Sequence, residues 1–226
     1  MGPMPEGFLA HDAAALGLGL VSGFALALVL VFVLARIRRR VGRSVAAPGV
    51  DALTGLLERA ALYERTRGLW SVAQRRMRPF TVVQLGIDGF GTLRQRHGAA
   101  ASEALLLAVA TRLRERCRAA DLVARWGDAE FLLALPETDE LEARMLAERL
   151  RGAVAALEIG SDAGRLRCTA SMGLAQRRDQ PTLEQLVHDA AHWLAAARAS
   201  GGDRVVAPPR ADFPELERAS GFGQLE

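Results

Sequence analysis

The stretch that decides the fold runs from Leu122 to Leu135 and reads LVARWGDAEFLLAL. Two apolar runs, Leu122 to Trp126 and Phe131 to Leu135, flank a short turn that contains Gly127 and Asp128. Glycine and aspartate favour tight turns, so apolar runs on either side of them predict two antiparallel strands joined as a β-hairpin. We therefore expect a hairpin near the middle of a folded domain.

Strands and helices are expected on both sides of this hairpin. Helical spacing of apolar residues predicts helices, whereas short apolar or β-branched runs predict strands. The expected helices cover residues 56–77, 100–117, 139–157 and 183–199, and the further strands cover residues 80–87, 166–175 and 203–206. A hairpin embedded among helical crossovers predicts an α+β domain with a mixed central sheet flanked by helices.

Composition limits the class of protein. The chain has 226 residues, of which 50% are hydrophobic and 24% charged, which suits a packed core and argues against disorder. Two cysteines, Cys117 and Cys168, are too few for a disulfide scaffold. The net charge of +3 comes entirely from the first fifty residues. Because nucleic-acid binders usually have their excess charge on the folded domain, nucleic acid is not expected as a partner.

Residues 13–35 form an uncharged apolar run, AAALGLGLVSGFALALVLVFVLA. This run is long enough to cross a hydrocarbon layer of about 30 Å as a helix. Two acids precede it and five arginines follow between residues 36 and 43, so the positive-inside rule places the chain after the span in the cytoplasm. We expect residues 1–12 to be a short extracytoplasmic N-terminus and residues 36–50 a basic juxtamembrane linker. Gly19 and Gly23 leave open a homodimer through this helix.

Five short segments stand in a fixed order after the linker: Asp51 to Leu56 (DALTGL), Ile87 to Phe90 (IDGF), Arg125 to Phe131 (RWGDAEF), Ser171 to Ala175 (SMGLA) and Gly201 to Val205 (GGDRV). Together they resemble the motifs of GGDEF domains, the family of diguanylate cyclases. The resemblance implies a nucleotide-cyclase or palm-like fold over residues 51–206, followed by a flexible tail over residues 207–226. It also implies metal-dependent condensation of two GTP into cyclic di-GMP.

Two positions to which the resemblance assigns metal-binding carboxylates have lost them. They are Gly86 and Ala129 here, and only Glu130 remains. Divalent magnesium prefers hard oxygen ligands, so one carboxylate is a poor cage for it. We therefore expect a degenerate domain that is not an enzyme, with no catalytic residue, no metal and no cofactor. Asp128 replaces a glycine, and its carboxylate either repels phosphate or serves as an ordinary turn residue.

Other positions that the resemblance assigns to nucleotide binding have changed as well. Arg94 stands where the family has asparagine, Gly91 and Arg198 where it has lysines, and Gly202 where it has arginine, while the acidic Glu103 is kept. Losing charge-assisted phosphate contacts weakens triphosphate binding. The sequence leaves open whether GTP still binds near Glu103 and Glu130.

The resemblance implies a second, inhibitory site with the pattern R-x-x-D. Arg118 and Asp121 match it, with the arginine nine residues before Gly127, and Arg149 stands at a further contributing position. A guanidinium can bind guanine O6 and N7 together, and a carboxylate accepts from the guanine N–H edge. The simpler alternative is a surface ion pair between Arg118 and Asp121. On the first interpretation, Arg118, Asp121 and Arg149 bind cyclic di-GMP.

These features lead to one leading hypothesis. The chain is expected to be a single-pass protein of the bacterial inner membrane, with its N-terminus outside and a catalytically inactive GGDEF domain in the cytoplasm. It would be a cyclic di-GMP receptor and regulatory subunit of an inner-membrane complex such as exopolysaccharide or surface-structure machinery. A homodimer through the span or the domain is left open. The alternatives are a ligand-independent scaffold and, less favoured, an active diguanylate cyclase.

Overall fold

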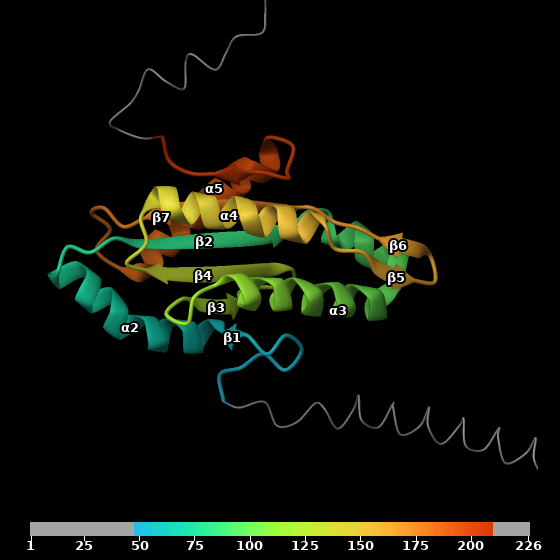
Figure 1. Ribbon diagram of the computed structural model, residues 1–226, viewed down its shortest axis with the longest axis horizontal. Coiled ribbons are helices and arrows are strands. Elements are labelled where there is room, and N and C mark those ends of the chain that lie inside the picture. Colours follow the sequence, from blue (N-terminus) through green and yellow to red (C-terminus); the bar gives the residue numbers. More distant parts are fainter. Residues whose placement is uncertain (1–47, 210–226) are drawn as a thin grey trace, which may run out of the picture. The chain divides into compact units, whose positions relative to one another are not determined.

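The computed structural model describes residues 48–209, in which a mixed six-stranded sheet lies between two layers of helices (Figure 1). The strand order is β1-β3-β4-β2-β7-β8. The strands are β1 (Leu57–Glu58), β2 (Phe80–Ile87), β3 (Leu122–Arg125), β4 (Glu130–Pro136), β7 (Ala170–Gln176) and β8 (Val205–Val206). The edge strands β1 and β8 pair in parallel with β3 and β7, and the inner pairings are antiparallel. The predicted mixed sheet and its central hairpin are confirmed.

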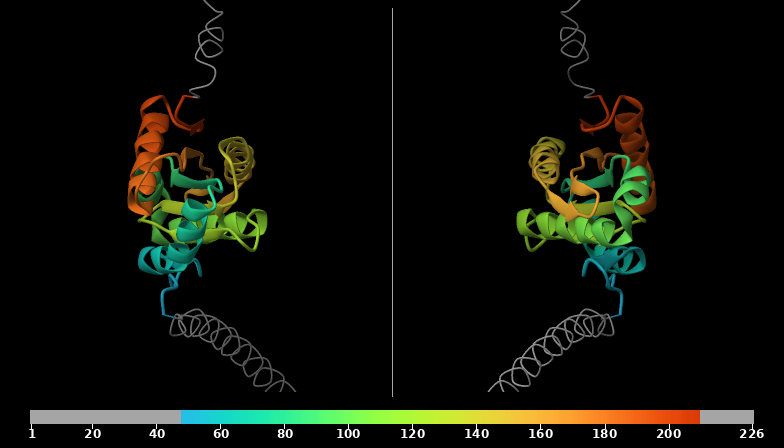
Figure 2. Two further views of the ribbon diagram at one scale, coloured as in Figure 1. Left: turned by 90° about the vertical axis from the view of Figure 1, so that its left-hand side faces the viewer. Right: turned by 90° about the vertical axis from the view of Figure 1, so that its right-hand side faces the viewer.

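Four helices cover the sheet, two on each face (Figure 2). They are α2 (Arg59–Arg75), α3 (Phe90–Arg116), α4 (Glu140–Ala155) and α5 (Leu183–Ala199). Side chains alternate between the faces of a strand, and β2 shows this clearly. Val83 and Leu85 belong to the core under α3 and α4, whereas Phe80 and Val82 belong to the core under α2 and α5. The domain is therefore three layers thick, with a hydrophobic core on each side of the sheet.

Local sequence explains where two of the helices begin. The Asp139 side chain, just before α4, accepts from the backbone N–H of Glu142 at 2.8 Å, and the Asp139 N–H donates to the Glu142 carboxylate at 3.3 Å. Thr182 caps α5 by accepting from the N–H of Gln185 at 3.2 Å. Such caps satisfy N–H groups that have no partner within the helix.

Helix α5 lies unusually close to strand β7. A Cβ atom added to Gly173 would lie 2.5 Å from the carbonyl carbon of Trp193, and nearer still to backbone atoms of Ala190 and Leu194. Only glycine permits this approach, because any side chain would meet backbone atoms that cannot rotate away. The contact fixes α5 against the sheet and thereby fixes the residues near its C-terminal end.

Three predicted elements differ from the structure by more than a shift of one or two residues at an end. The helix expected over 100–117 begins ten residues earlier at Phe90 and continues through a break at Gly98, whose φ is 80°. The strand expected over 166–175 is two strands, because Gly164–Leu166 (β6) pairs with Ile159–Ser161 (β5) in a separate hairpin and β7 begins only at Ala170. The helix expected over 56–77 begins at Arg59, since Leu57–Glu58 pairs with β3 as a strand.

The predicted membrane span at residues 13–35 lies outside the described residues, as do residues 1–12, most of the predicted linker and the tail beyond residue 209. Within residues 48–209, no helix combines the length and the apolar character that a bilayer crossing requires.

Candidate functional site: the signature hairpin and the R-x-x-D turn

The signature hairpin joins β3 to β4, and its turn is held by its own residues. The backbone N–H groups of Trp126 and Gly127 both donate to the carbonyl of Glu130, at 2.8 and 3.2 Å. The Arg125 side chain donates to the carbonyls of Gly127 at 3.3 Å and Asp128 at 3.1 Å. These bonds from the backbone and from Arg125 fix the conformation of the turn between β3 and β4.

Arg125 also ties the hairpin to the first motif of the domain. Its Nη1 lies 3.2 Å from both carboxylate oxygens of Asp51, and only 18% and 21% of the two side chains are exposed. Burial alone would raise the pKa of Asp51, but hydrogen bonds from Thr54 and the positive charge of Arg125 outweigh it and lower that pKa. The pair is therefore a structural link between residue 51 and the hairpin.

Each carboxylate oxygen of Glu130, the acid that remains at the signature, accepts a hydrogen bond from another side chain. Its Oε1 accepts from Nη1 of Arg198 at 2.8 Å, and its Oε2 accepts from Nε2 of Gln84 at 3.0 Å. Arg198 comes from the last turn of α5 and Gln84 from β2. Neither partner was predicted, because both lie far from Glu130 in sequence.

Gly86 pairs with Glu130 on one side of β2 and with Ser171 on the other. A Cβ atom at this position would lie 2.7 Å from Cζ of Arg198 and would overlap the guanidinium nitrogen Nη2. The Arg198 guanidinium therefore fills the space that a side chain at position 86 would need. Ala129, the other changed position, is partly buried and packs against the core.

Asp88, from the second motif, accepts hydrogen bonds from other groups of the protein on both carboxylate oxygens. Its Oδ1 accepts from the Ser171 hydroxyl at 2.7 Å, and its Oδ2 accepts from the Thr169 hydroxyl at 2.7 Å and from the N–H of Asp203 at 3.0 Å. These bonds attach the turn after α5 to the end of β2. Asp88 is thus a positioning residue for the segment that follows Arg198.

Two substituted positions meet across the hairpin turn. Arg94 on α3 lies 3.7 Å from the carboxylate of Asp128, with side chains that are 56% and 72% exposed. An ion pair this exposed adds little stability. The two opposite charges nevertheless lie between α3 and the hairpin turn, on the side where the resemblance places the nucleotide.

The structure brings Arg118 and Asp121 together in one tight turn. The Asp121 carboxylate accepts from the Arg118 backbone N–H at 2.7 Å, and the Asp121 N–H donates to the Arg118 carbonyl at 3.0 Å. Burial raises the pKa of Asp121, partly offset by the Arg118 N–H and charge. Within residues 48–209 the exposed Arg118 guanidinium has no ion-pair partner, so the expected alternative, an ion pair with Asp121, does not form.

Arg149 lies on α4, with an exposed side chain, and α4 packs against α3, whose C-terminal end leads into the Arg118 turn. No hydrogen bond within residues 48–209 joins Arg149 to Arg118 or Asp121. The structure therefore unites two of the three predicted ligand residues and places the third on the neighbouring helix.

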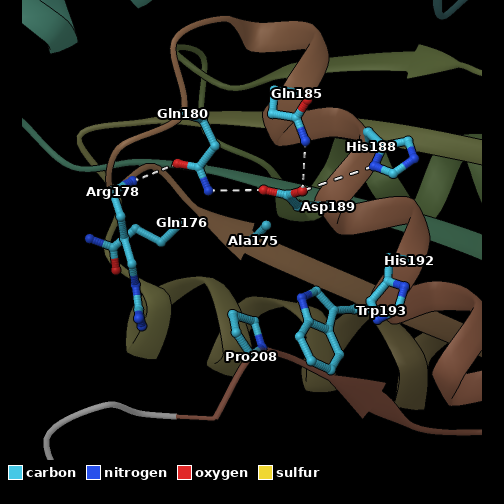
Figure 3. Close-up of a pocket in the computed structure, with 10 residues that line it drawn as sticks. All are labelled: Ala175, Gln176, Arg178, Gln180, Gln185, His188, Asp189, His192, Trp193 and Pro208. Carbon is cyan, nitrogen blue, oxygen red and sulfur yellow. Dashed lines mark hydrogen bonds and ion pairs between the residues drawn. The ribbon is translucent and has the colours of Figure 1, made fainter.

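A hollow of about 410 Å³ lies beside the N-terminal half of α5 and was not predicted (Figure 3). Asp189 accepts from Gln180 at 2.9 Å and from Gln185 at 3.3 Å, and Trp193 lies farther along the same wall. Its lining includes none of the signature residues 125–131. The sequence gives only scattered polar side chains here, on segments that the fold alone brings together.

A mixed sheet between two helical layers, with an acidic turn between its inner strands β3 and β4, is consistent with the fold of GGDEF cyclase domains. The chain belongs to the GGDEF family, since the family model described as "Diguanylate cyclase, GGDEF domain" matches residues 49–204. Diguanylate cyclase DgcP of Pseudomonas aeruginosa is 35% identical over 155 residues, which cover 69% of this chain and 23% of that protein. Diguanylate cyclase DgcM of Escherichia coli K12 is 32% identical over 157 residues, covering 70% and 38%. The chain thus spans less than half the length of these relatives.

Solved structures agree with this assignment. Diguanylate cyclase SiaD, crystallised with its activator SiaC from Pseudomonas aeruginosa, is 30% identical with a TM-score of 0.68, covering 87% of this chain and 79% of that one. The GGDEF domain of DgcB from Caulobacter crescentus, in complex with c-di-GMP, also has a TM-score of 0.68 and covers 71% of this chain and 93% of that one. At 22% identity, the second likeness shows the fold alone.

The prediction that this protein is not an enzyme is wrong. The family is one of enzymes, and the relatives that match at 35% and 32% identity are named diguanylate cyclases. The prediction extrapolated from two side chains, at positions 86 and 129, to the activity of a whole domain. A match that extends over residues 49–204 outweighs those two positions.

Proposed function

We propose that this protein is a cyclic di-GMP receptor that binds its ligand at Arg118, Asp121 and Arg149. The observation behind the proposal is the reciprocal turn between Arg118 and Asp121. It holds the carboxylate in place through the backbone and leaves the Arg118 guanidinium exposed and without an ion-pair partner in residues 48–209. A guanidinium that is exposed and unpaired, beside a carboxylate that the turn holds in place, is available to bind a ligand.

The two side chains suit a guanine base. The Arg118 guanidinium can donate to guanine O6 and N7 at once, and the Asp121 carboxylate can accept from the guanine N–H edge. Asp121 keeps one carboxylate oxygen, Oδ1, without a partner among the described residues, since only Oδ2 accepts from Arg118. Arg149, from the adjacent helix, would bind the second guanine or a phosphate of the same ligand.

Related folds support this class of ligand. The DgcB GGDEF domain was crystallised with c-di-GMP, and a further microbial GGDEF domain, 24% identical with a TM-score of 0.62, was solved in a study of its interaction with bis-cyclic di-GMP. These are properties of those proteins, and they make the same ligand the first one to test here.

The proposal includes a cellular setting. The receptor would be a regulatory subunit of a membrane assembly, held in the bacterial inner membrane by a single span at residues 13–35 with the domain in the cytoplasm. SiaD was crystallised with a separate activator protein, so a relative of this fold works with a protein partner. A homodimer, through the span or the domain, is part of the same proposal.

Isothermal titration of the purified full-length chain with cyclic di-GMP tests the ligand and the site. Charge-assisted contacts contribute about 1.5–3 kcal/mol each, so Arg118→Ala and Arg149→Ala should each weaken binding by roughly ten- to a hundredfold. Arg116→Ala and Arg144→Ala are matched controls, since Arg116 ends α3 two residues before Arg118 and Arg144 lies on α4 with Arg149. Absence of binding by the wild type, or an unchanged affinity in Arg118→Ala, would overturn the proposal.

Condensation of GTP is a second candidate function, favoured by the names of the 35% and 32% identical relatives. Incubation of the full-length chain with labelled GTP and either Mg²⁺ or Mn²⁺, followed by chromatography, tests it directly. Formation of cyclic di-GMP would establish a cyclase that also has a regulatory site. Recovery of unchanged GTP from freshly folded protein would reject this candidate.

A further inference from the structure

The resemblance implies a divalent cation beside the signature hairpin, and the residues present there do not fit one. Positions 86 and 129 are glycine and alanine. Both oxygens of Glu130 and both oxygens of Asp88 accept hydrogen bonds from protein groups. Within residues 48–209 no three acidic, histidine or cysteine side chains gather as a metal site would require. Mg²⁺ needs several oxygen ligands together, and the acid kept at the metal-binding positions, Glu130, is already paired with the Arg198 guanidinium.

A different cation lies at this position. The Arg198 guanidinium occupies the space beside Gly86 and donates to Oε1 of Glu130 at 2.8 Å. Arginine remains charged at every pH at which proteins fold, and its nitrogens donate hydrogen bonds without ligating metal. The surviving acid is therefore neutralised by a charge that belongs to the chain.

We infer that Arg198 is a built-in cation that takes the place of a divalent metal at the signature hairpin. This inference concerns a different site from the proposed receptor function and does not depend on it. Losing the carboxylate at position 86 is what makes the arrangement fit, because any side chain there would overlap the guanidinium.

Neighbouring contacts hold the guanidinium where it is. The close approach at Gly173 fixes α5 against β7, and Arg198 is in the last turn of that helix. Gln84 donates to the other oxygen of Glu130 at 3.0 Å, so the carboxylate cannot turn toward a competing cation without losing both bonds. The ion pair is only partly exposed, with 40% of the Arg198 side chain and 30% of the Glu130 side chain accessible.

Titration of the full-length chain with Mn²⁺, followed by electron paramagnetic resonance, tests the inference. Mn²⁺ is the probe because its free and bound forms give different spectra. The wild type and Glu130→Gln should bind the same amount of Mn²⁺, because Glu130 is not expected to ligate the ion. The triple variant Gly86→Asp, Ala129→Asp, Arg198→Ala restores two carboxylates and removes the guanidinium, so it should bind Mn²⁺ at least about tenfold more tightly than the wild type.

The matched control replaces Arg204 instead of Arg198 in the same background of two new aspartates. Arg204 donates only to the Gly202 carbonyl among the described residues, and this control keeps the Arg198 side chain, whose charge can still pair with the acids of the site. This control should not gain Mn²⁺. Mn²⁺ bound by the wild type and lost in Glu130→Gln would overturn the inference, and so would a folded triple variant with no gain. If circular dichroism shows the triple variant unfolded, the wild-type comparison with Glu130→Gln decides alone.

Discussion

Replacing Gly173 with alanine should destabilise the domain by about 3–7 kcal/mol. The new Cβ would lie 2.5 Å from the Trp193 carbonyl carbon and nearer still to backbone atoms of Ala190 and Leu194, whereas ordinary contact begins near 3.4 Å, so α5 must retreat from β7 by at least roughly 1 Å. A gap of that size forfeits about half of the packing energy under the helix. Leu186, Val187 and Leu194 are buried there and contribute about 1.5–3 kcal/mol each, which makes that loss roughly 2–4 kcal/mol. Strain from the added methyl group, about 1–3 kcal/mol, makes up the rest.

Urea unfolding followed by circular dichroism measures this change. Gly152→Ala is the matched control, because Gly152 is exposed in the last turn of α4 and no atom lies within 4 Å of an added Cβ. That variant should be more stable than the wild type by about 0.5–1 kcal/mol, since alanine suits a helix better than glycine. A loss below about 1 kcal/mol in Gly173→Ala would refute the close approach of α5 to the sheet.

Three further predictions concern charged and ionisable groups. Arg125→Ala should cost about 1–3 kcal/mol in urea unfolding, because Asp51 loses its charged partner. Because the pKa of Asp51 is lowered in the folded state, its charge stabilises the domain above the unfolded pKa, and this stability is lost as pH falls through the folded pKa. The loss of stability at acid pH should therefore be smaller in Arg125→Ala. An unchanged acid dependence of the free energy of unfolding would contradict the Asp51–Arg125 contact. Burial raises the pKa of Asp121, so cyclic di-GMP affinity measured by calorimetry should fall as pH drops through that raised value, and Asp121→Asn should flatten the profile. Burial raises the pKa of Cys117 to about 12 and that of Cys168 to about 11, so iodoacetamide at neutral pH should label both slowly until urea is added, whereas rapid labelling of the folded chain would count against their burial.

Elements with a strong local pattern were predicted to the residue. The strand over 80–87 follows Pro79 and is buried along its whole length, and the helix over 183–199 follows its cap at Thr182. Both are bounded by residues whose local chemistry starts or stops the element. The first turns of α3 were missed because their apolar spacing is weak: before the break at Gly98 only Phe90 is buried and Leu93 packs partly against the core.

In the candidate site, too, local contacts could be predicted from the sequence and contacts between distant residues could not. The Arg118–Asp121 turn spans four residues, so its pattern could be found in the sequence. The contact between Arg198 and Glu130 joins residues 68 positions apart, and only the packing of α5 on β7 brings them together. The sequence shows that Arg198 and Gly86 are changed and that Glu130 remains. No sequence pattern shows that the arginine fills the space beside Gly86.

The shared space at positions 86 and 198 constrains how the sequence can evolve. Aspartate at position 86 would require the Arg198 guanidinium to swing aside, because its first side-chain atom would overlap the guanidinium. That movement would take the arginine away from Glu130, which would lose its charged partner. Changes at the two positions are therefore coupled, and the energetic effect of either one depends on the residue at the other.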